Sequence, residues 1–312
     1  MKSKIEKTLR KGKYSYLKID SLNLTDDDLY FRDINETSLG FNTGAVEKTI
    51  SFFLTTFKLT NEKQFREKFV ESISGDGDEL AKNNALHSSS LCALLCFYNV
   101  KTNHLVLNDI VYDDVYFEFK NKVVKNPSNM DVVLTGKDKN GDDSILFIEC
   151  KFSEFLGTKS SKLGETYKKE PFKHIFDGFQ YEKQKVFQYG LKQLVTHYIG
   201  IKNFMTEDPT EYKKCMKKYY RSSEVDRINL YRSFKNVSFL EVVFEFEKEP
   251  DFQQYLDETK LVFETLEQER KTDNLNLNLL GTVTYQHLFR DYKNGINSQV
   301  LDPVVMEFYN LK

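Results

Sequence analysis

The chain has 312 residues, of which 40% are hydrophobic and 29% are charged, as in an ordinary soluble globular protein. Its formal net charge is −2, which excludes a basic field over the whole surface, so attraction for nucleic acid must come from local clusters. The Lys-rich residues 1–20 lack the apolar segment of a signal peptide, and no stretch reaches the roughly 20 apolar residues of a membrane span. We therefore expect a soluble, cytoplasmic protein.

The cysteines carry no metal-binding or disulfide pattern. There are four, at Cys92, Cys96, Cys150 and Cys215, and no Cys-x-x-Cys pair or zinc-type Cys/His spacing occurs. We expect buried or free thiols in a reducing compartment.

The first predicted elements lie before residue 101. Residues 50–59 are β-branched and aromatic and predict a strand, whereas residues 61–72 have helical spacing of their Phe side chains. The Gly-Asp repeat at 75–78 predicts a break. The serines at 88–90 are good N-caps for an apolar helix over 91–100.

Three strands are predicted next. They cover residues 114–120, 130–135 and 144–152. Asn140-Gly141, between the second and third strands, is a strong hairpin signal. We therefore expect these strands to pair antiparallel.

The second half of the chain alternates helix and strand. A Lys-rich loop over 153–177 precedes a predicted helix over 178–199, a strand over 237–246 and a helix over 252–269. A strand end and a short helix close the chain over 282–292. This order predicts an α/β (α+β) fold in which a mixed sheet is flanked by helices, with helical additions at both ends.

Two charged residues end the otherwise apolar third strand. Alternation places Glu149 and Lys151 on one face and Cys150 on the other. Buried opposite charges are costly unless something stabilises them. The hairpin would bring Asp131, on the preceding strand, beside Glu149. We expect the three charged side chains to meet at one point.

This set of residues suits divalent-metal chemistry. Mg²⁺ prefers carboxylate oxygens, so Asp131 and Glu149 would hold it, together with the backbone carbonyl of Cys150. The metal would acidify a bound water and neutralise charge on a phosphate. Lys151 would orient the attacking water, lower its pKa, or stabilise the transition state.

The Glu-x-Lys spacing carries no weight by itself, because it occurs five times: Glu118/Lys120, Glu149/Lys151, Glu211/Lys213, Glu258/Lys260 and Glu269/Lys271. The strand, the hairpin and the partner Asp131 distinguish the second copy. The first copy is the rival site, because it also lies on a strand, with Asp113 and Asp114 upstream. The alternative without catalysis is an ion pair on a sheet edge, worth at most about 1 kcal/mol.

The sequence resembles the PD-(D/E)XK nuclease superfamily, which has the restriction-endonuclease-like fold, over roughly residues 79–246. It is also similar to a group of bacterial restriction endonucleases. The residues that carry the likeness are Asn126-Pro127, Asn129-Met130-Asp131, Phe147 to Glu154, Glu79-Leu80, Ala85 to Ser89, Phe117-Glu118, Gln193-Leu194, His197 and Thr284-Tyr285-Gln286. Pro127 lies four residues before Asp131, whereas the superfamily motif places the two side by side.

The resemblance implies a core in helix–strand–strand–strand–helix–strand (αβββαβ) order over residues 76–250. Residues 1–75 would be an N-terminal extension packed on that core, and residues 251–312 a C-terminal helical extension. Asp131 and Glu149 would be metal ligands and Lys151 catalytic. The implied activity is a Mg²⁺-dependent endodeoxyribonuclease of restriction or defence, with Mn²⁺ as a substitute, double-stranded DNA as substrate and a homodimer as assembly. The alternative is a catalytically silent nucleic-acid-binding or interaction protein on the same fold.

Many superfamily members carry one more acidic residue on the first core helix. The predicted helix over 91–100 has none. Glu79, just upstream, is our choice for a catalytic role, and Glu118 is the alternative. For each of them the other interpretation is a solvated surface carboxylate.

Supporting residues are expected on the long helix and in the basic segments. Gln193 and His197 are four residues apart and share a helix face. Many superfamily members place polar residues of this helix near the active site, so the resemblance implies a contact with DNA phosphate or with the catalytic carboxylates. The alternative is a hydrogen-bonded pair on the helix surface. Segments 159–174 and 202–221 each carry a net charge of +3. The first includes Lys168 and Lys169 and follows the Glu149 strand, so it could neutralise DNA phosphates. Ordinary solvated faces are the alternative for both segments.

Overall fold

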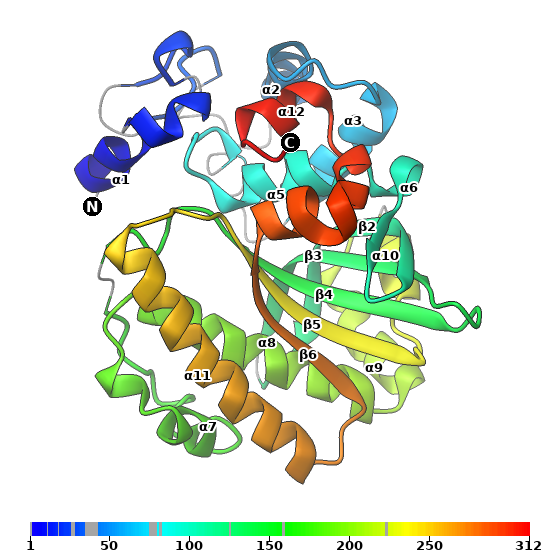
Figure 1. Cartoon of the computed structure of the whole chain (residues 1–312). Helices are drawn as coiled ribbons and strands as arrows, with labels where there is room; N and C mark the ends of the chain where they lie inside the picture. Colours follow the sequence, from blue (N-terminus) through cyan, green and yellow to red (C-terminus); the bar gives the residue numbers. More distant parts are fainter. Residues whose placement is uncertain are drawn as a thin grey trace.

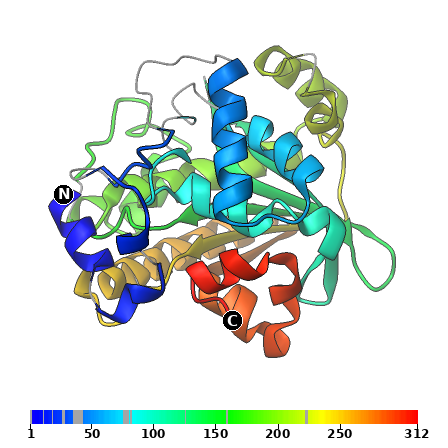
Figure 2. The same ribbon diagram turned by 90° about the horizontal axis from the view of Figure 1, so that it is seen from above.

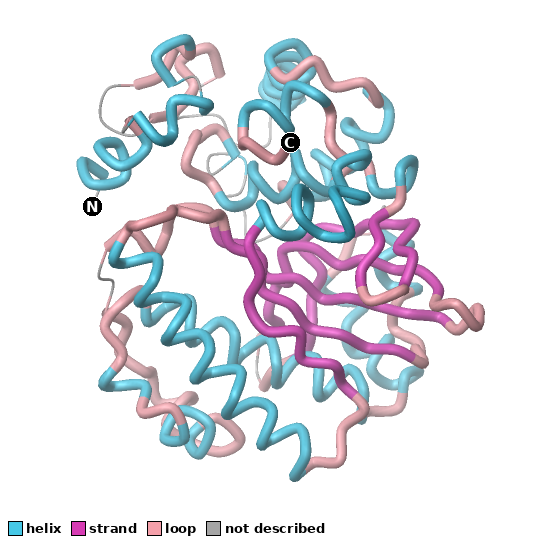
Figure 3. The backbone as a smooth tube through the Cα atoms, in the orientation of Figure 1, coloured by secondary structure: helices cyan, strands magenta, loops and turns pink. Residues whose placement is uncertain are grey.

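The computed structural model describes residues 2–10, 12–17, 19–25, 29–34, 43–74, 80, 83–124, 126–157, 160–221 and 224–312. Its centre is one curled, six-stranded sheet (Figure 3). The strands are β1 (Leu105–Leu107), β2 (Ile110–Lys122), β3 (Pro127–Lys137), β4 (Asp143–Lys151), β5 (Asn236–Val243) and β6 (Leu277–Thr284).

The sheet is mixed, as predicted. Its strand order is β1-β2-β3-β4-β5-β6, so every strand lies beside its neighbours in sequence. The first four strands pair antiparallel, whereas β4, β5 and β6 run parallel. Parallel neighbours need crossover connections, and helices supply them between β4 and β5 and between β5 and β6.

Helices cover both faces of the sheet (Figure 1). On one face lie α8 (Gln188–Thr206) and α11 (Pro250–Thr272), with α7 (Lys173–Gly178) and α9 (Pro209–Met216) nearby. On the other face lie α5 (Ser89–Phe97) and α12 (Pro303–Phe308). The remaining α-helices of the described residues are α1 (Lys2–Leu9), α2 (Thr43–Thr56), α3 (Glu62–Ser72), α6 (Val100–Asn103) and α10 (Val225–Asn229).

Several predicted elements are confirmed. Asn61 caps the start of helix α3. Ser88 caps α5, because its side-chain oxygen accepts a hydrogen bond from the backbone N–H of Leu91. The Asn140-Gly141 turn joins β3 to β4, and Gly141 has the positive φ of +82° that favours glycine there. The mixed sheet flanked by helices follows from these elements.

Two predicted elements are wrong. Residues 50–59 belong largely to helix α2, because their buried side chains Ile50, Phe53 and Phe57 recur at helical spacing rather than alternately. The helix predicted over 178–199 begins only at Gln188. The chain breaks before it, at Gln180 (φ +54°) and Phe187 (φ +45°).

The ends of the chain also pack on this framework. Strand β6 joins the sheet from within the predicted helical extension, and a π-helix over Gln286–Asp291 follows it. Near the N-terminus, Tyr14 packs edge-on against Phe246 with ring centroids 5.1 Å apart, and Figure 2 shows this segment beside the start of α11. No helix among the described residues is both long and apolar enough to cross a membrane.

Candidate active site

The ends of β3 and β4 bring two carboxylates together. The ladder between these strands reaches Val132 opposite Ile148, so one further step places Asp131 opposite Glu149. The N–H of Cys150 donates to Oδ2 of Asp131 at 2.7 Å, which fixes the carboxylate at this point. The N–H and C=O of a strand residue point to the same side, so the Cys150 carbonyl also faces Asp131.

A buried lysine neutralises this corner of the sheet. Glu149 and Lys151 are 1% and 4% exposed. The Lys151 ammonium donates to Oε1 of Glu149 and, at 3.1 Å, to Oε1 of Gln193 on α8. Both charges are therefore paired despite their burial, which reduces the cost of placing them there.

One turn further along α8, His197 contacts the same carboxylate. Its Nε2 lies 2.9 Å from Oε2 of Glu149, within ion-pair distance, although the two atoms do not meet in hydrogen-bond geometry. The structure thus brings together five predicted residues: Asp131, Glu149, Lys151, Gln193 and His197. Their roles stay predictions.

The two carboxyl groups differ in acidity. Burial raises the pKa of Glu149, but Lys151 and His197 outweigh it and hold the pKa at about 2. Burial and the neighbouring charge of Glu149 raise the pKa of Asp131 well above its ordinary value. Burial lowers the pKa of Lys151, yet Glu149 and Asp131 hold it above its usual range. Glu149 therefore stays ionised beside Lys151, whereas the Asp131 carboxyl group holds its proton more readily than an ordinary aspartate.

Glu118 reaches the same corner from β2. It lies between the ladder pairs Phe117–Val132 and Phe119–Met130, opposite Asp131. Its φ of +51° is left-handed, a conformation that costs a non-glycine residue about 1–3 kcal/mol and that clusters at functional sites. The structure therefore places Glu118 near the proposed metal ligands.

A buried arginine holds this distorted stretch of strand. Arg227 donates to the carbonyls of Phe117 (3.0 Å) and Glu118 (3.4 Å), while the N–H of Phe117 donates to Oε1 of Glu71 (3.0 Å). Arg227 also pairs with Glu71, 3.6 Å away, and with Glu224. These partners satisfy the outer edge of β2, which no strand of the described residues covers at this point, and they fix the backbone of Glu118.

The corner opens into a cavity of ≈ 350 Å³. Ser153 donates to the carbonyl of His87 (3.1 Å), which ties the loop before α5 to the end of β4. The Glu154 carboxylate accepts hydrogen bonds from the backbone N–H groups of Phe152 (2.8 Å) and Ser153 (2.9 Å). The cavity is lined by Tyr30, Ala85, His87, Ser88, Ser89, Ser90, Glu118, Asn129, Asp131, Lys151, Glu154, Phe187, Tyr189 and Gln193.

Other predicted residues lie elsewhere. Lys168 and Lys169 are exposed in a surface turn and do not line the cavity, and Lys168 pairs with Glu165 at 2.8 Å. Asp114 of the rival site lines a different cavity beside Arg227. Glu79 lies outside the described residues.

Three residues near the site were not singled out from the sequence. Tyr189 stands one turn before Gln193 on α8, so helical spacing could have found it. Glu154 follows the strand motif directly. Glu241 on β5 is the parallel partner of Glu149. It is fully buried and accepts from Tyr255 (2.6 Å) and Thr282 (2.8 Å), and burial raises its pKa to about 7.

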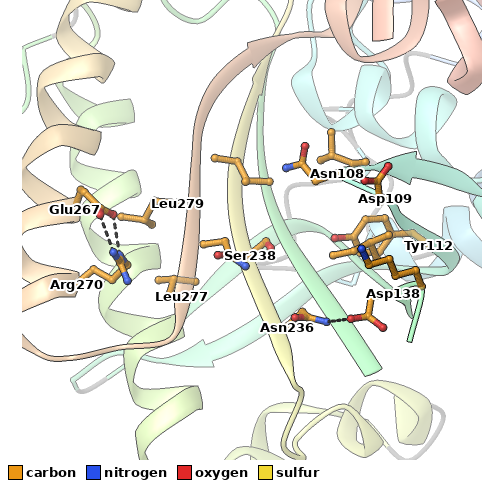
Figure 4. A pocket seen from close by; sticks show the side chains of 15 residues that line it. Asn108, Asp109, Tyr112, Asp138, Asn236, Ser238, Glu267, Arg270, Leu277 and Leu279 are labelled. Carbon is orange, nitrogen blue, oxygen red and sulfur yellow. Dashed lines mark hydrogen bonds and ion pairs between the residues drawn. The ribbon is translucent and has the colours of Figure 1, made fainter. Parts of the chain in front are cut away.

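A second cavity, of ≈ 620 Å³, lies at the opposite end of β4 and β5 (Figure 4). Its polar side chains bond to one another: Asn236 donates to Asp138 at 3.2 Å, and Arg270 pairs with Glu267 at 2.7 Å. The carboxylates of Asp109 and Glu267 in this cavity are held in separate ion pairs, with Lys293 and Arg270, and these side chains are partly or largely exposed, unlike Glu149 and Lys151. The smaller cavity is therefore the better candidate for catalysis.

The donor set around Asp131 fits a divalent cation. Oε2 of Glu149 is buried, 2.9 Å from Nε2 of His197, and Asp131 supplies a second carboxylate beside it. Hard oxygen donors of this kind suit Mg²⁺ or Mn²⁺. Within the described ranges, no group of three or more His, Cys, Asp or Glu side chains forms a ready-made metal cluster.

Fold and site together define a mixed α/β protein with a carboxylate–lysine pocket at the end of a central strand. A family model described as "Restriction Endonuclease associating with ARP" matches residues 41–302, which is most of the chain. The protein belongs to this restriction-endonuclease family. Comparison with curated proteins and with solved structures gave no match.

Proposed function

We propose that the protein is a metal-dependent endodeoxyribonuclease that hydrolyses phosphodiester bonds of double-stranded DNA, on a PD-(D/E)XK core in αβββαβ order. The observation that carries this proposal is the meeting of Asp131 and Glu149 across β3 and β4, with Lys151 on the same face. Membership of a restriction-endonuclease family supports a nuclease and a DNA substrate. A role in restriction or defence, working as a homodimer and with the associate ARP that the family description names, belongs to the same proposal.

Each residue has a distinct task in this proposal. Asp131, Glu149 and the carbonyl of Cys150 would hold Mg²⁺, which supplies an acidified water and neutralises phosphate charge. Lys151 stabilises negative charge on the phosphate or orients the water. Gln193 accepts a hydrogen bond from the Lys151 ammonium and so holds it in position. His197 contacts the Glu149 carboxylate and helps to hold it in place.

The alternative is a protein that binds DNA, or another partner, on the same fold without cutting. One observation favours it: Lys151 and His197 both engage Glu149, so the carboxylate is already neutralised. The two functions differ in a simple way. The nuclease cuts DNA only with a divalent metal, whereas the binding protein retains DNA without cutting it.

Incubation with plasmid and linear DNA, methylated and unmethylated, tests the proposal. We expect cleavage with Mg²⁺ or Mn²⁺ and none with EDTA. Lys213, in the Glu-x-Lys copy on α9, offers a matched control, because Lys213→Ala removes a half-buried lysine of the same spacing away from the cavity. Binding without cleavage on every substrate and metal supports the alternative.

A further inference from the structure

Tyr189 is unusual among the aromatic side chains. The sequence has 26 Phe and 18 Tyr, and within the described ranges Tyr189 is the one that is exposed, at 39%. It lines the same ≈ 350 Å³ cavity as Asp131 and Lys151. An aromatic ring gains stability from burial, so an exposed one in a functional cavity needs a reason.

Neighbouring residues of the chain hold the Tyr189 ring in place. The buried Phe187 precedes it in a left-handed conformation (φ +45°), and their ring centroids are 6.2 Å apart. Gly190 permits this packing, because a Cβ there would lie 2.6 Å from the Phe187 ring and 2.8 Å from the Tyr255 hydroxyl. The packing around Phe187 and Gly190 therefore fixes the position of the Tyr189 side chain.

A lysine ammonium group lies close to the Tyr189 ring. The Lys192 ammonium lies 4.7 Å from the centroid of Tyr189 and 5.2 Å from that of Tyr167. An exposed aromatic face next to a positive charge is the combination with which proteins bind nucleic acid strands: the ring stacks on a base, and the cation neutralises phosphate. Every base has a π-face, so such a platform works on many sequences.

The size of the cavity defines the ligand further. A volume of ≈ 350 Å³ is at the low end of small-ligand pockets, so it suits one nucleotide rather than a whole duplex. We propose that Tyr189 is a stacking platform for an unstacked base, next to a phosphate that Lys151 contacts in the same cavity. This inference rests on the proposed function, because it places a nucleic acid strand at that site. The base comes from a single strand or is swung out of a duplex.

Binding in EDTA tests the platform without any cleavage. Fluorescence polarisation compares a labelled oligothymidylate with an abasic deoxyribose-phosphate chain of equal length, which has the same charge but no bases. Wild type, Tyr189→Ala, Tyr189→Phe and Tyr219→Ala are measured. Tyr219 is the matched control, because Lys218 lies 4.9 Å from its ring and it does not line the cavity.

We expect Tyr189→Ala to bind oligothymidylate about 5- to 150-fold more weakly, the range for one lost base–aromatic stack. Its binding to the abasic chain stays as in wild type, and Tyr189→Phe and Tyr219→Ala bind both chains as wild type does. Equal losses on both chains, no loss on either, or no binding by wild type overturns the platform. A thermal melt confirms that each variant is folded.

A fully paired duplex of the same length identifies the source of the base. Sensitivity to Tyr189→Ala on the duplex as well indicates that the protein swings a base out, whereas sensitivity on the single strand alone indicates a single-stranded source. The proposed nuclease function fails in a distinguishable way. In that case no metal supports cleavage, while the Tyr189-dependent binding persists.

Discussion

The N–H of Cys150 donates to the carboxylate of Asp131 at 2.7 Å, across the ends of two neighbouring strands. This bond turns Asp131 toward the corner where Glu149 and Lys151 lie. It also leaves the Asp131 charge beside that of Glu149, which raises the pKa of Asp131. These two carboxylates are the ones that we propose as ligands of a divalent cation.

Loss of the Asp131 charge should weaken cation binding. Asp131→Asn keeps an acceptor for the Cys150 amide but removes one of two carboxylates, so we expect Mn²⁺ affinity to fall at least about tenfold in isothermal titration. Asp142→Asn, in the hairpin at the other end of the same strands, is the matched control and should bind as wild type does. Unchanged affinity in Asp131→Asn would remove Asp131 from the site.

The further acidic residue can be assigned by comparing two variants. Glu118 lines the cavity, whereas Glu79 lies outside the described residues. We expect Glu118→Gln to slow DNA cleavage by about 10²-fold, because it removes a charge beside Asp131, and Glu79→Gln is measured beside it. Initial cleavage rates under saturating Mg²⁺ decide between them. If Glu79→Gln slowed cleavage more than Glu118→Gln, Glu79 would be the further acidic residue.

Arg227 should be important for stability. Its removal takes one ion-pair partner from Glu71, which keeps Lys68, and one from Glu224, and it frees the carbonyls of Phe117 and Glu118. Breaking a buried pair in this way costs about 3–5 kcal/mol. Urea unfolding of Arg227→Ala should show a loss of this size. Arg232→Ala, which removes an exposed ion pair with Asp143, should lose less than about 1 kcal/mol.

Glu241 should make stability depend on pH. Burial raises its pKa from 4.5 to about 7, so the folded protein favours the neutral carboxyl. The stability of wild type relative to Glu241→Gln should be greatest below about pH 4.5 and should fall as the pH rises to about 7. The total change is about 3 kcal/mol. Urea unfolding of both proteins from pH 4 to 8 measures the difference, and a flat difference contradicts the assignment.

The sequence predicted the part of the site that depends on strand geometry. Alternation placed Glu149 and Lys151 on one face, and the Asn140-Gly141 hairpin brought Asp131 opposite Glu149. Helical spacing likewise placed Gln193 and His197 together. These contacts follow from short-range rules, so no knowledge of distant packing was needed.

Other features depended on tertiary contacts. Residues 50–59 have β-forming side chains, yet packing at helical spacing made them part of α2. The left-handed backbone of Glu118 depends on Arg227, more than 100 residues away, which no local pattern reveals. The parallel pairing that buries Glu241 beside Glu149 required the crossover through α8.

The most direct test of the account is plasmid cleavage by Lys151→Ala beside wild type, with Mg²⁺ and with EDTA. The account predicts that wild type cuts only with Mg²⁺, that Lys151→Ala is at least about 10²-fold slower, and that Lys213→Ala cuts as fast as wild type. All three proteins should melt as folded proteins. Cleavage by folded Lys151→Ala at the wild-type rate would contradict the assignment of this site.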